Sequence, residues 1–336
     1  MTARSGLKNL LLGALPVLMI AGCASGGRLP SAVEGSAPTT TAPPAAQEFT
    51  CPAGQVEPSG VTPKSYAPDG PLPSPDDLPD GSTMAAIRDR GALRIGVSAD
   101  TLLFGARNPL TGKIEGFDID MLKEVAKAIF GVDDAVAYNY LDFVVIPYSQ
   151  RLPKLRNGDV DIVAHTMTIN CVRWQQIAFS SEYYRSGQRV LVDVTSQFGS
   201  IDELDAAGAT VCVPDGSTNL ENLAAYPGLT VVALPDVSDC LVALQAGEVQ
   251  AITGDDTVMA GLNKQDPATA VVGDKFSFEP YGLGMPTEHV DFVKFVNALL
   301  EEMRTDGRWQ SIYDRWLLAT LGAQTPPDAR YGRQEP

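Results

Sequence analysis

Histidine and clustered basic residues are scarce in this sequence, and both shortages exclude classes of function. Only 2 of the 336 residues are histidine, and no Cys-x-x-Cys pair or Cys/His cluster occurs, which argues against a zinc site. The net charge is −16 and no basic run follows Lys8, so nucleic-acid phosphates have no surface to bind. No nucleophile elbow, phosphate-binding loop or metal-ligand motif is present. We therefore expect no enzyme, no cofactor, no metal and no nucleic-acid partner.

Long apolar runs are also missing, apart from Leu10–Ile20, which is too short for a confident transmembrane helix. Arg4 and Lys8 precede this run, as in an export signal. The run leads into Ile20-Ala21-Gly22-Cys23, which resembles the bacterial lipobox. We expect residues 1–22 to be a lipoprotein signal peptide and Cys23 to carry the lipid. Its acyl chains would hold the protein on the extracytoplasmic face of the cell membrane.

Residues 23–82 are expected to form a disordered tether after the lipidated cysteine. Twelve of the 25 prolines fall between Ala24 and Ser82, among many Ala, Ser, Thr and Gly residues. Such a segment cannot bury enough apolar surface to order itself. Cys51 within it implies one point of attachment to the folded body.

Strands and helices alternate through the rest of the chain, which predicts an α/β fold with parallel sheets. Apolar spacing predicts a helix over Gly116–Ile129, and strands are expected at Leu93–Val97 and Ala135–Leu141. We assign 83–188 to a first lobe, 189–279 to a second lobe and 280–322 to a return into the first. Residues 323–336 are expected to be a loose polar tail.

Five segments of the body resemble one known family. They are GFDIDMLKEVAKAI (116–129), DIVAHTMTINCVRWQQIAFSSEYY (161–184), VCVPDGSTNL (211–220), ALQAGEVQAITGDD (243–256) and DGRWQSIYDRWL (306–317). They are similar to the polar amino-acid-binding proteins of ABC importers, family 3 of the extracellular solute-binding proteins. The lipobox, tether and cysteine positions are similar to glutamine- and glutamate-binding lipoproteins of actinobacteria. The resemblance implies a type II periplasmic-binding-protein fold, with two lobes of mostly parallel sheet and two crossover strands as the hinge.

For an amino-acid ligand, the resemblance supplies partners for both charged groups. Arg173 would bind the α-carboxylate, since a guanidinium can make two parallel charge-assisted hydrogen bonds. Thr168 would offer its hydroxyl to the same carboxylate or to the ammonium, and Thr166 would contact the ammonium through its backbone. Asp255 would neutralise the ammonium, with Asp256 as its competitor.

Two further sets of residues are candidates for the site. Ser217 and Thr218 follow a strand and open a helix, where free amides can hold an anion, although helix caps use the same residue types. An aromatic wall suits the methylene stem of a ligand side chain, and the proposed side-chain pocket comprises Asp100, Phe104, Tyr148 and His165. Phe104 as a core residue and His165 as a satisfied hinge-strand histidine are the alternatives.

The hinge that the resemblance implies also bears on the four remaining cysteines. Cys171 belongs to the first lobe, and Cys212 and Cys240 belong to the second. Of the three possible pairings, only Cys51–Cys171 with Cys212–Cys240 leaves the two lobes free to move. We expect that pairing.

The resulting hypothesis is a monomeric, lipid-anchored binding protein that delivers its ligand to an ABC permease. The ligand would be glutamate or aspartate, or else glutamine or asparagine, and a basic His165 with nearby arginines favours the acidic pair. The alternative is a sensor lipoprotein that signals through a transmembrane partner without transport.

Overall fold

The first lobe is built around a five-stranded sheet whose central strands are buried. The structure, a computed structural model, describes residues 59–335. The strands are Leu93–Val97 (β1), Leu141–Val145 (β5), Ile162–Ala164 (β6), Ala178–Phe179 (β7) and Gly284–Met285 (β15). Their order is β5-β1-β6-β15-β7. β1 pairs in parallel with β5 and β6, whereas β15 runs antiparallel to β6 and β7. A late segment of the chain therefore returns to complete the first sheet.

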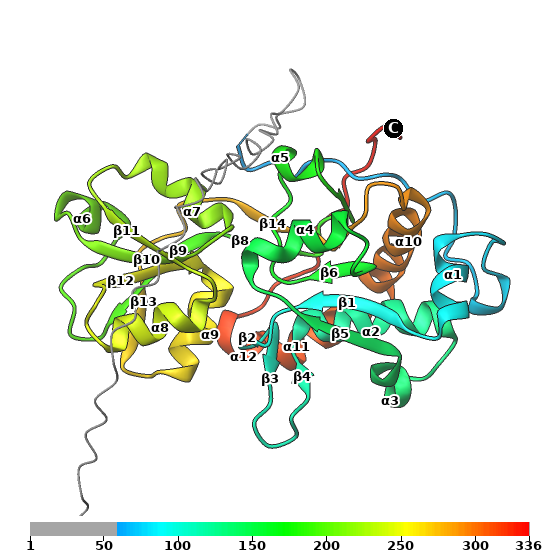
Figure 1. Cartoon of the computed structure of the whole chain (residues 1–336), viewed down its shortest axis with the longest axis horizontal. Coiled ribbons are helices and arrows are strands. Elements are labelled where there is room, and N and C mark those ends of the chain that lie inside the picture. Colours follow the sequence, from blue (N-terminus) through cyan, green and yellow to red (C-terminus); the bar gives the residue numbers. More distant parts are fainter. Residues whose placement is uncertain (1–58, 336) are drawn as a thin grey trace, which may run out of the picture. The chain divides into compact units, whose positions relative to one another are not determined.

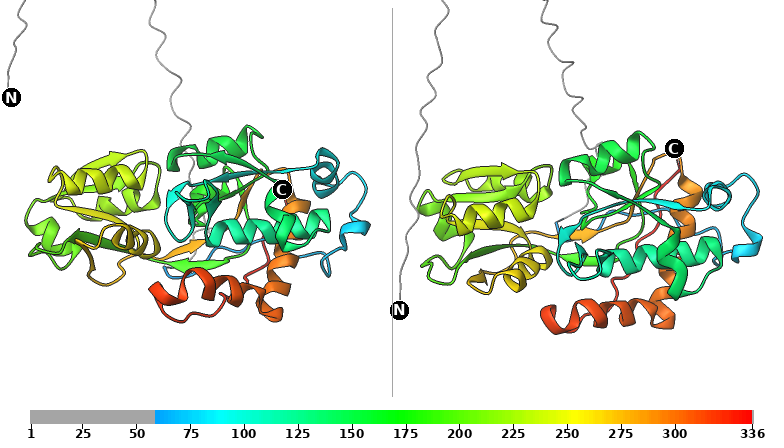
Figure 2. Two further views of the ribbon diagram at one scale, coloured as in Figure 1. Left: turned by 90° about the horizontal axis from the view of Figure 1, so that it is seen from below. Right: turned by 60° about the horizontal axis from the view of Figure 1, so that its bottom comes forward.

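The helices of the first lobe come from both ends of the described chain, and α2, α4, α5 and α10 contact the strands of its sheet. They are Thr83–Arg90 (α1), Phe117–Phe130 (α2), Asp134–Ala137 (α3), Arg151–Arg156 (α4), Cys171–Trp174 (α5), Val290–Asp306 (α10), Arg308–Trp316 (α11) and Leu318–Leu321 (α12). α2 buries Leu122, Val125 and Ile129 at helical spacing, as the sequence predicts. α10 and α11 pack against α2, and both views of Figure 2 show α10–α12, in orange and red, along one side of the lobe.

Short elements complete this lobe. A small three-stranded sheet contains Asp100–Thr101 (β2), Gly105–Arg107 (β3) and Ile114–Glu115 (β4). Single 3-10 turns occur at Pro75–Asp77 (η1), Tyr138–Tyr140 (η2) and Tyr148–Gln150 (η3). The turn η3 leads directly into α4, and this junction carries two residues of the candidate site.

The second lobe has its own five-stranded sheet, in the order β11-β10-β12-β9-β13. Its strands are Gln188–Asp193 (β9), Thr210–Pro214 (β10), Thr230–Leu234 (β11), Ala251–Asp255 (β12) and Thr269–Val272 (β13). Its helices are Ile201–Ala206 (α6), Thr218–Asn222 (α7), Val237–Gln245 (α8) and Asp256–Gln265 (α9), with a 3-10 turn at Leu223–Ala225 (η4). Figure 1 shows these elements together at the left.

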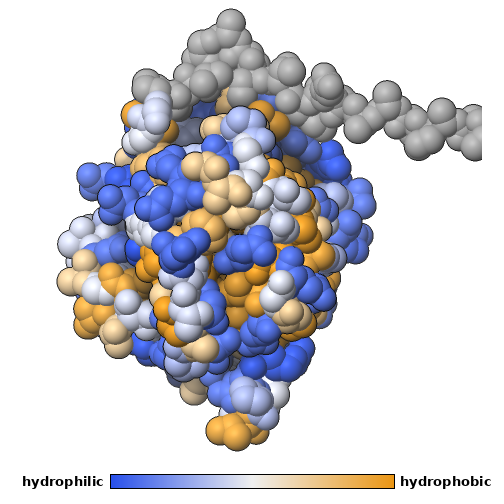
Figure 3. Space-filling model, turned by 90° about the vertical axis from the view of Figure 1, so that its left-hand side faces the viewer, coloured by the Kyte–Doolittle hydropathy of each residue, from blue (hydrophilic) through white to orange (hydrophobic). Residues whose placement is uncertain are grey.

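Both faces of the second sheet are buried. Val190 and Val192 of β9 belong to one apolar cluster, whereas Leu191 between them belongs to another. Because neighbouring side chains of a strand point to opposite faces, the two clusters lie on the two sides of the sheet. The outer surface in Figure 3 mixes hydrophobic side chains with hydrophilic ones.

Two strands carry the chain between the lobes. Tyr184–Ser186 (β8) leads from the first lobe to the second, and Glu279–Tyr281 (β14) leads back. The two pair antiparallel, with Tyr184 opposite Tyr281. The two-lobed α/β architecture with two crossover strands is thus confirmed.

One expected strand is displaced. The sequence predicts it at Ala135–Leu141, but Asp134–Tyr140 winds through α3 and η2, and the strand follows at Leu141–Val145. The valine and tyrosines of this segment are residue types that favour strands. Its tyrosines instead pack on neighbouring rings, Tyr140 on Phe130 and Tyr138 on Phe143, and this tertiary packing decides the conformation.

The described parts of the expected tether and tail pack on the first lobe. Tyr66 is buried and stacks edge-on against Trp174. Ser65 forms a bridge with Tyr331, and Asn297 of α10 donates to the Tyr66 carbonyl at 2.8 Å. Residues 59–82 and 323–335 therefore differ from the loose segments expected there, because a few aromatic and polar contacts among many prolines fix them. Cys23 and the rest of the expected tether lie outside the described residues.

Cys212 of β10 and Cys240 of α8 form a disulfide within the second lobe, as expected. Cys171 is also disulfide-bonded, and Cys51, its expected partner, lies outside the described residues. Across residues 59–335, every helix is too short or too polar to span a membrane.

The lobes touch at several points besides the crossover strands. Asp100 Oδ2 accepts hydrogen bonds from the Ser238 hydroxyl at 2.7 Å and from its backbone amide at 3.2 Å. A Cβ on Gly261 of α9 would lie 2.6 Å from the carbonyl oxygen of Leu102. The second lobe therefore approaches the backbone of the first too closely for a side chain at position 261.

We predict that Gly261→Ala opens the lobes without unfolding them. Alanine favours the helix by about 1 kcal/mol relative to glycine, whereas its methyl group blocks the approach to Leu102. Pulsed electron resonance between spin labels on the two lobes should show longer distances, with an unchanged or higher unfolding temperature. Gly70→Ala is the control, because a Cβ there meets nothing within 4 Å. An unchanged distance distribution in Gly261→Ala would refute this prediction.

Candidate functional site

Arg173 is buried between the lobes, where the sequence places the carboxylate-binding residue. It lies in α5, whose first turn is capped by Asn170, which accepts from the Arg173 amide at 2.8 Å. The guanidinium donates to the carbonyl of Thr168 at 2.9 Å and to that of Gly216 in the second lobe at 3.4 Å. Burial lowers its pKa. Within residues 59–335 it pairs with no carboxylate, so its charge is available to an anion.

A second buried guanidinium, Arg151, was missed by the sequence analysis. Arg151 is 1% exposed and donates to the backbone carbonyls of Tyr148 at 3.0 Å, His165 at 3.0 Å and Gly216 at 3.1 Å. Burial and the nearby charge of Arg173 lower its pKa to about 9. Its side chain lies 4.6 Å from the ring centre of Tyr148. In the described part of the chain this cation also lacks a carboxylate partner.

Asp255 faces these arginines from the second lobe. It ends β12 and accepts hydrogen bonds from Asn219 at 2.8 Å and from the Tyr281 hydroxyl at 2.6 Å. Burial, with a smaller effect of the nearby Glu279 charge, raises its pKa to about 7. Its competitor Asp256 is engaged elsewhere, because it pairs with Lys275 at 2.8 Å and accepts from Ser186.

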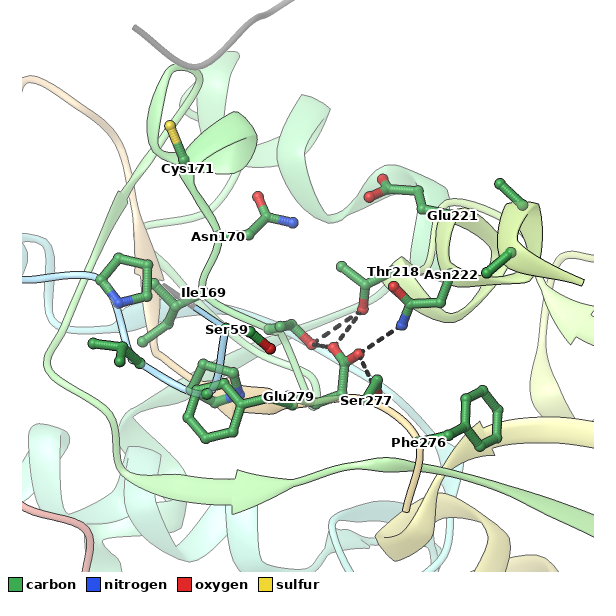
Figure 4. A pocket seen from close by; sticks show the side chains of 18 of the residues that line it. Ser59, Ile169, Asn170, Cys171, Thr218, Glu221, Asn222, Phe276, Ser277 and Glu279 are labelled. Atoms are coloured by element: carbon green, nitrogen blue, oxygen red, sulfur yellow. Dashed lines mark hydrogen bonds between the residues drawn. The ribbon is translucent and has the colours of Figure 1, made fainter. Parts of the chain in front are cut away.

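Thr168 and Thr218 meet at the seam between the lobes, with their hydroxyl oxygens 3.2 Å apart. Both hydroxyls donate to one oxygen of Glu279, at 2.6 and 2.7 Å. Glu279 was not among the residues predicted from the sequence. These three residues line a cavity of about 650 Å³ between the lobes, and Figure 4 shows the Glu279 carboxylate hydrogen-bonded to the side chains of Thr218, Asn222 and Ser277. Ser217, by contrast, caps α7 and donates to the Pro214 carbonyl.

Three polar atoms of the predicted pocket are buried without a well-formed hydrogen bond to any described residue. They are the Tyr148 hydroxyl, the His165 Nδ1 and the Thr166 hydroxyl. The rings of Tyr148 and His165 lie 4.5 Å apart. Thr166 has a positive φ of 43°, and its amide donates to Asp118 at 3.0 Å. Unsatisfied buried polar groups are costly, so this cluster suits a polar ligand group.

The structure gives the other two predicted pocket residues different surroundings. Asp100 binds Ser98 and reaches across the seam to Ser238. Phe104 is fully buried, with its ring packed edge-on against Phe117, Tyr184 and Tyr281. Phe104 thus lies in an aromatic cluster beneath the crossover strands, which was the alternative considered for it.

Residues 93–319 match the bacterial extracellular solute-binding proteins, family 3. The chain belongs to this family. Solved structures of related proteins share the two-lobed type II periplasmic-binding fold. One is an ancestral arginine-binding protein bound to glutamine, with 32% identity and a TM-score of 0.62, which covers 70% of this chain and 99% of that one.

Similar solute-binding proteins include binders of two related amino acids. The ABC transporter glutamine-binding protein GlnH of Bacillus subtilis is 36% identical over 70% of this chain and 84% of its own length. The glutamate-binding protein GluB of Corynebacterium efficiens is 29% identical over 73% of this chain and 84% of its own length.

The two residues that the sequence analysis missed left faint signals. Arg151 follows Tyr148-Ser149-Gln150 at the start of a helix, where an arginine is ordinarily exposed. Glu279 is a lone acid directly before the largely apolar segment from Pro280 to Met285. An acid in a strand that must be buried is a candidate for a site, and that rule would have found Glu279.

We predict that amino-acid affinity depends on the ionisation of Asp255. Its raised pKa means that the empty site is partly protonated near neutrality, and a ligand ammonium requires the carboxylate. Affinity should therefore fall as pH decreases through 7, by about tenfold between pH 8 and pH 6. Calorimetric titrations in two buffers of different ionisation enthalpy should show proton release on binding.

Asp118 is the control for this pH dependence, because burial raises its pKa to about 7 as well. It accepts from Tyr183 and Thr166 within the first lobe. If Asp255 causes the loss of affinity at low pH, Asp118→Asn should show the same fall in affinity between pH 8 and pH 6 as the wild type. A slope that vanishes in Asp118→Asn, or an affinity that is flat from pH 6 to pH 8, would contradict the assignment to Asp255.

Proposed function

We infer that this protein binds glutamate or aspartate, or else glutamine or asparagine, between its lobes and delivers it to an ABC permease. The observation that carries the proposal is a pair of opposite charges on the two lobes, Arg173 and Asp255. Both side chains are buried, and burial lowers the pKa of Arg173 and raises the pKa of Asp255 to about 7. Within the described residues they form no ion pair with each other or with any other group. A zwitterion between them would give each its counter-charge.

The ligand's α-carboxylate would bind Arg173 beside the amino-terminal end of α7. Its ammonium would bind Asp255. Charge-assisted hydrogen bonds of this kind contribute about 1.5–3 kcal/mol each, and a micromolar dissociation constant requires about −8 kcal/mol in total. Two such contacts alone do not reach that total after the costs of association, so the proposal also requires hydrogen bonds to the ligand side chain and burial of its methylene stem.

The ligand side chain would extend toward Tyr148, His165 and Arg151. Burial, with the nearby Arg151 charge, lowers the pKa of His165 to about 3, so the expectation that a basic His165 meets a second carboxylate is wrong. Arg151 is the cation in this pocket instead, and it supports an acidic side chain. Nε2 of His165 lies 3.2 Å from the Ile146 carbonyl, where it can donate its hydrogen, so Nδ1 can accept a hydrogen bond from an amide. The pocket thereby also suits glutamine and asparagine.

We predict that Arg173→Ala abolishes this binding and that Arg151→Met changes its selectivity. A thermal-shift screen of the twenty amino acids should identify the acidic amino acids and their amides as stabilising ligands of the wild type. A ligand at 100 times its dissociation constant adds about 2.7 kcal/mol to stability. Arg173→Ala should show no shift with any of them.

Selectivity is measured as the ratio of affinities for glutamate and glutamine, which cancels any general loss of folding. Arg151→Met should lower this ratio by about tenfold, since one charge-assisted interaction with the acidic side chain is lost. Arg156→Met, which changes an exposed arginine of the same helix, should leave the ratio unchanged. An unaltered ratio in Arg151→Met would refute the role of Arg151.

The lipid anchor is part of the same proposal and rests on the sequence around Cys23. We predict that a Cys23→Ala variant, which has no thiol for the lipid, leaves the membrane fraction, while the wild-type protein stays with it. Cell fractionation with immunodetection measures the difference. A Cys23→Ala protein that still sediments with membranes would contradict lipidation at this residue.

A further inference from the structure

Glu279 lies at the centre of the seam and binds groups from three parts of the chain. Its side chain is almost fully buried in the crossover strand β14. One carboxylate oxygen accepts from the hydroxyls of Thr168 and Thr218, and the other accepts from Asn222 at 2.9 Å and Ser277 at 2.6 Å. These four hydrogen bonds are drawn in Figure 4. No described cation forms an ion pair with this carboxylate.

These bonds fix the direction of the Thr168 hydroxyl. A hydroxyl has a single hydrogen, and a carboxylate is an acceptor only. At 2.6 Å from Glu279, the hydrogen of Thr168 is committed to that carboxylate. The oxygen of Thr168 therefore retains only lone pairs for any further partner, and a lone pair repels a carboxylate and attracts an ammonium group.

We propose that Glu279 is a positioning residue that makes Thr168 an acceptor for the ligand's ammonium group. The inference rests on the proposed amino-acid binding and selects between the two roles that the sequence left open for Thr168. Asp255 and the Thr168 oxygen together then accept from the ammonium, while Arg173 binds the carboxylate. Glu279 itself touches no ligand atom, and it acts by holding a proton away from the ligand.

A purely structural role for Glu279 and a positioning role predict different changes in ligand affinity. Glu279 joins Thr168 of the first lobe to Thr218 and Asn222 of the second, so its loss could weaken closure for every ligand alike. A positioning role affects only ligands that carry an ammonium group. The decisive quantity is therefore the ratio of affinities for two ligands that differ in that group alone.

The test compares L-glutamate with glutarate, and L-glutamine with glutaramate, by calorimetric titration. Each second compound has the same chain and carboxylate but no ammonium. In Glu279→Gln, an amide N–H can face Thr168 and turn its hydroxyl hydrogen toward the ligand. We expect the preference for the amino acid over its deaminated analogue to fall by about tenfold, the equivalent of one charged hydrogen bond. Thr168→Val should reduce the same preference.

Glu221→Gln is the matched control. Glu221 lines the same cavity, is exposed, and makes no hydrogen bond to either threonine. Glu221→Gln should keep the wild-type ratio of the affinities for the amino acid and for its deaminated analogue. Equal losses for both ligands in Glu279→Gln would overturn the positioning role. A wild-type protein that binds none of glutamate, aspartate, glutamine and asparagine would overturn the proposed function itself, which keeps the two failures distinct.

Discussion

Charges buried without opposite partners are the constraint on which this site depends. Arg151 and Arg173 of the first lobe face Asp255 of the second, with Glu279 on the crossover between them. Within residues 59–335 none of the four forms an ion pair. Each is held instead by neutral donors or acceptors, such as backbone carbonyls for the arginines and hydroxyls for the acids. Such groups cost several kcal/mol to bury, and natural proteins seldom retain them without a use.

The lowered pKa of Arg173 and the raised pKa of Asp255 are consequences of this burial. Each shift shows that the folded protein disfavours the charged form of the group. A ligand of opposite charge at each position reverses that penalty, so part of the cost of burial is recovered on binding. In the proposed function the two charges come from different lobes, so a ligand that binds both also links the lobes. The same electrostatics would favour a zwitterion over a simple anion or cation.

The sequence was sufficient for most of the fold and for part of the site. The apolar run at Leu93–Val97 located β1 to the residue, since buried parallel strands leave a continuous apolar run. Arg173 and Asp255 followed from family motifs, because their backbone context is encoded locally. Arg151 and Glu279 could not be identified in this way. For Arg151, nothing in its neighbours along the chain shows that an arginine at a helix start will be buried. For Glu279, the apolar segment after it indicates burial, but its partners Thr168 and Thr218 come from distant parts of the chain.

The lowered pKa of His165 likewise depends on residues that are distant in the sequence. It results from burial and from Arg151, which lies 14 residues away in sequence, so a pattern of residue types could not reveal it. Phe104 shows the converse, because an aromatic residue after a strand suits either a ligand wall or a core. In the structure its ring packs against Phe117, Tyr184 and Tyr281, which come from other segments of the chain.

The contacts that the second lobe makes with the first come from elements that are cross-linked to each other. Its two contact regions are the turn after β10, which presents Gly216 and Thr218, and the start of α8, which presents Ser238. The disulfide between Cys212 and Cys240 joins those same two elements. The disulfide therefore ties the two contact regions to each other. The hydrogen bond at Asp100 and the contacts around Glu279 thus depend on one cross-linked unit of the second lobe.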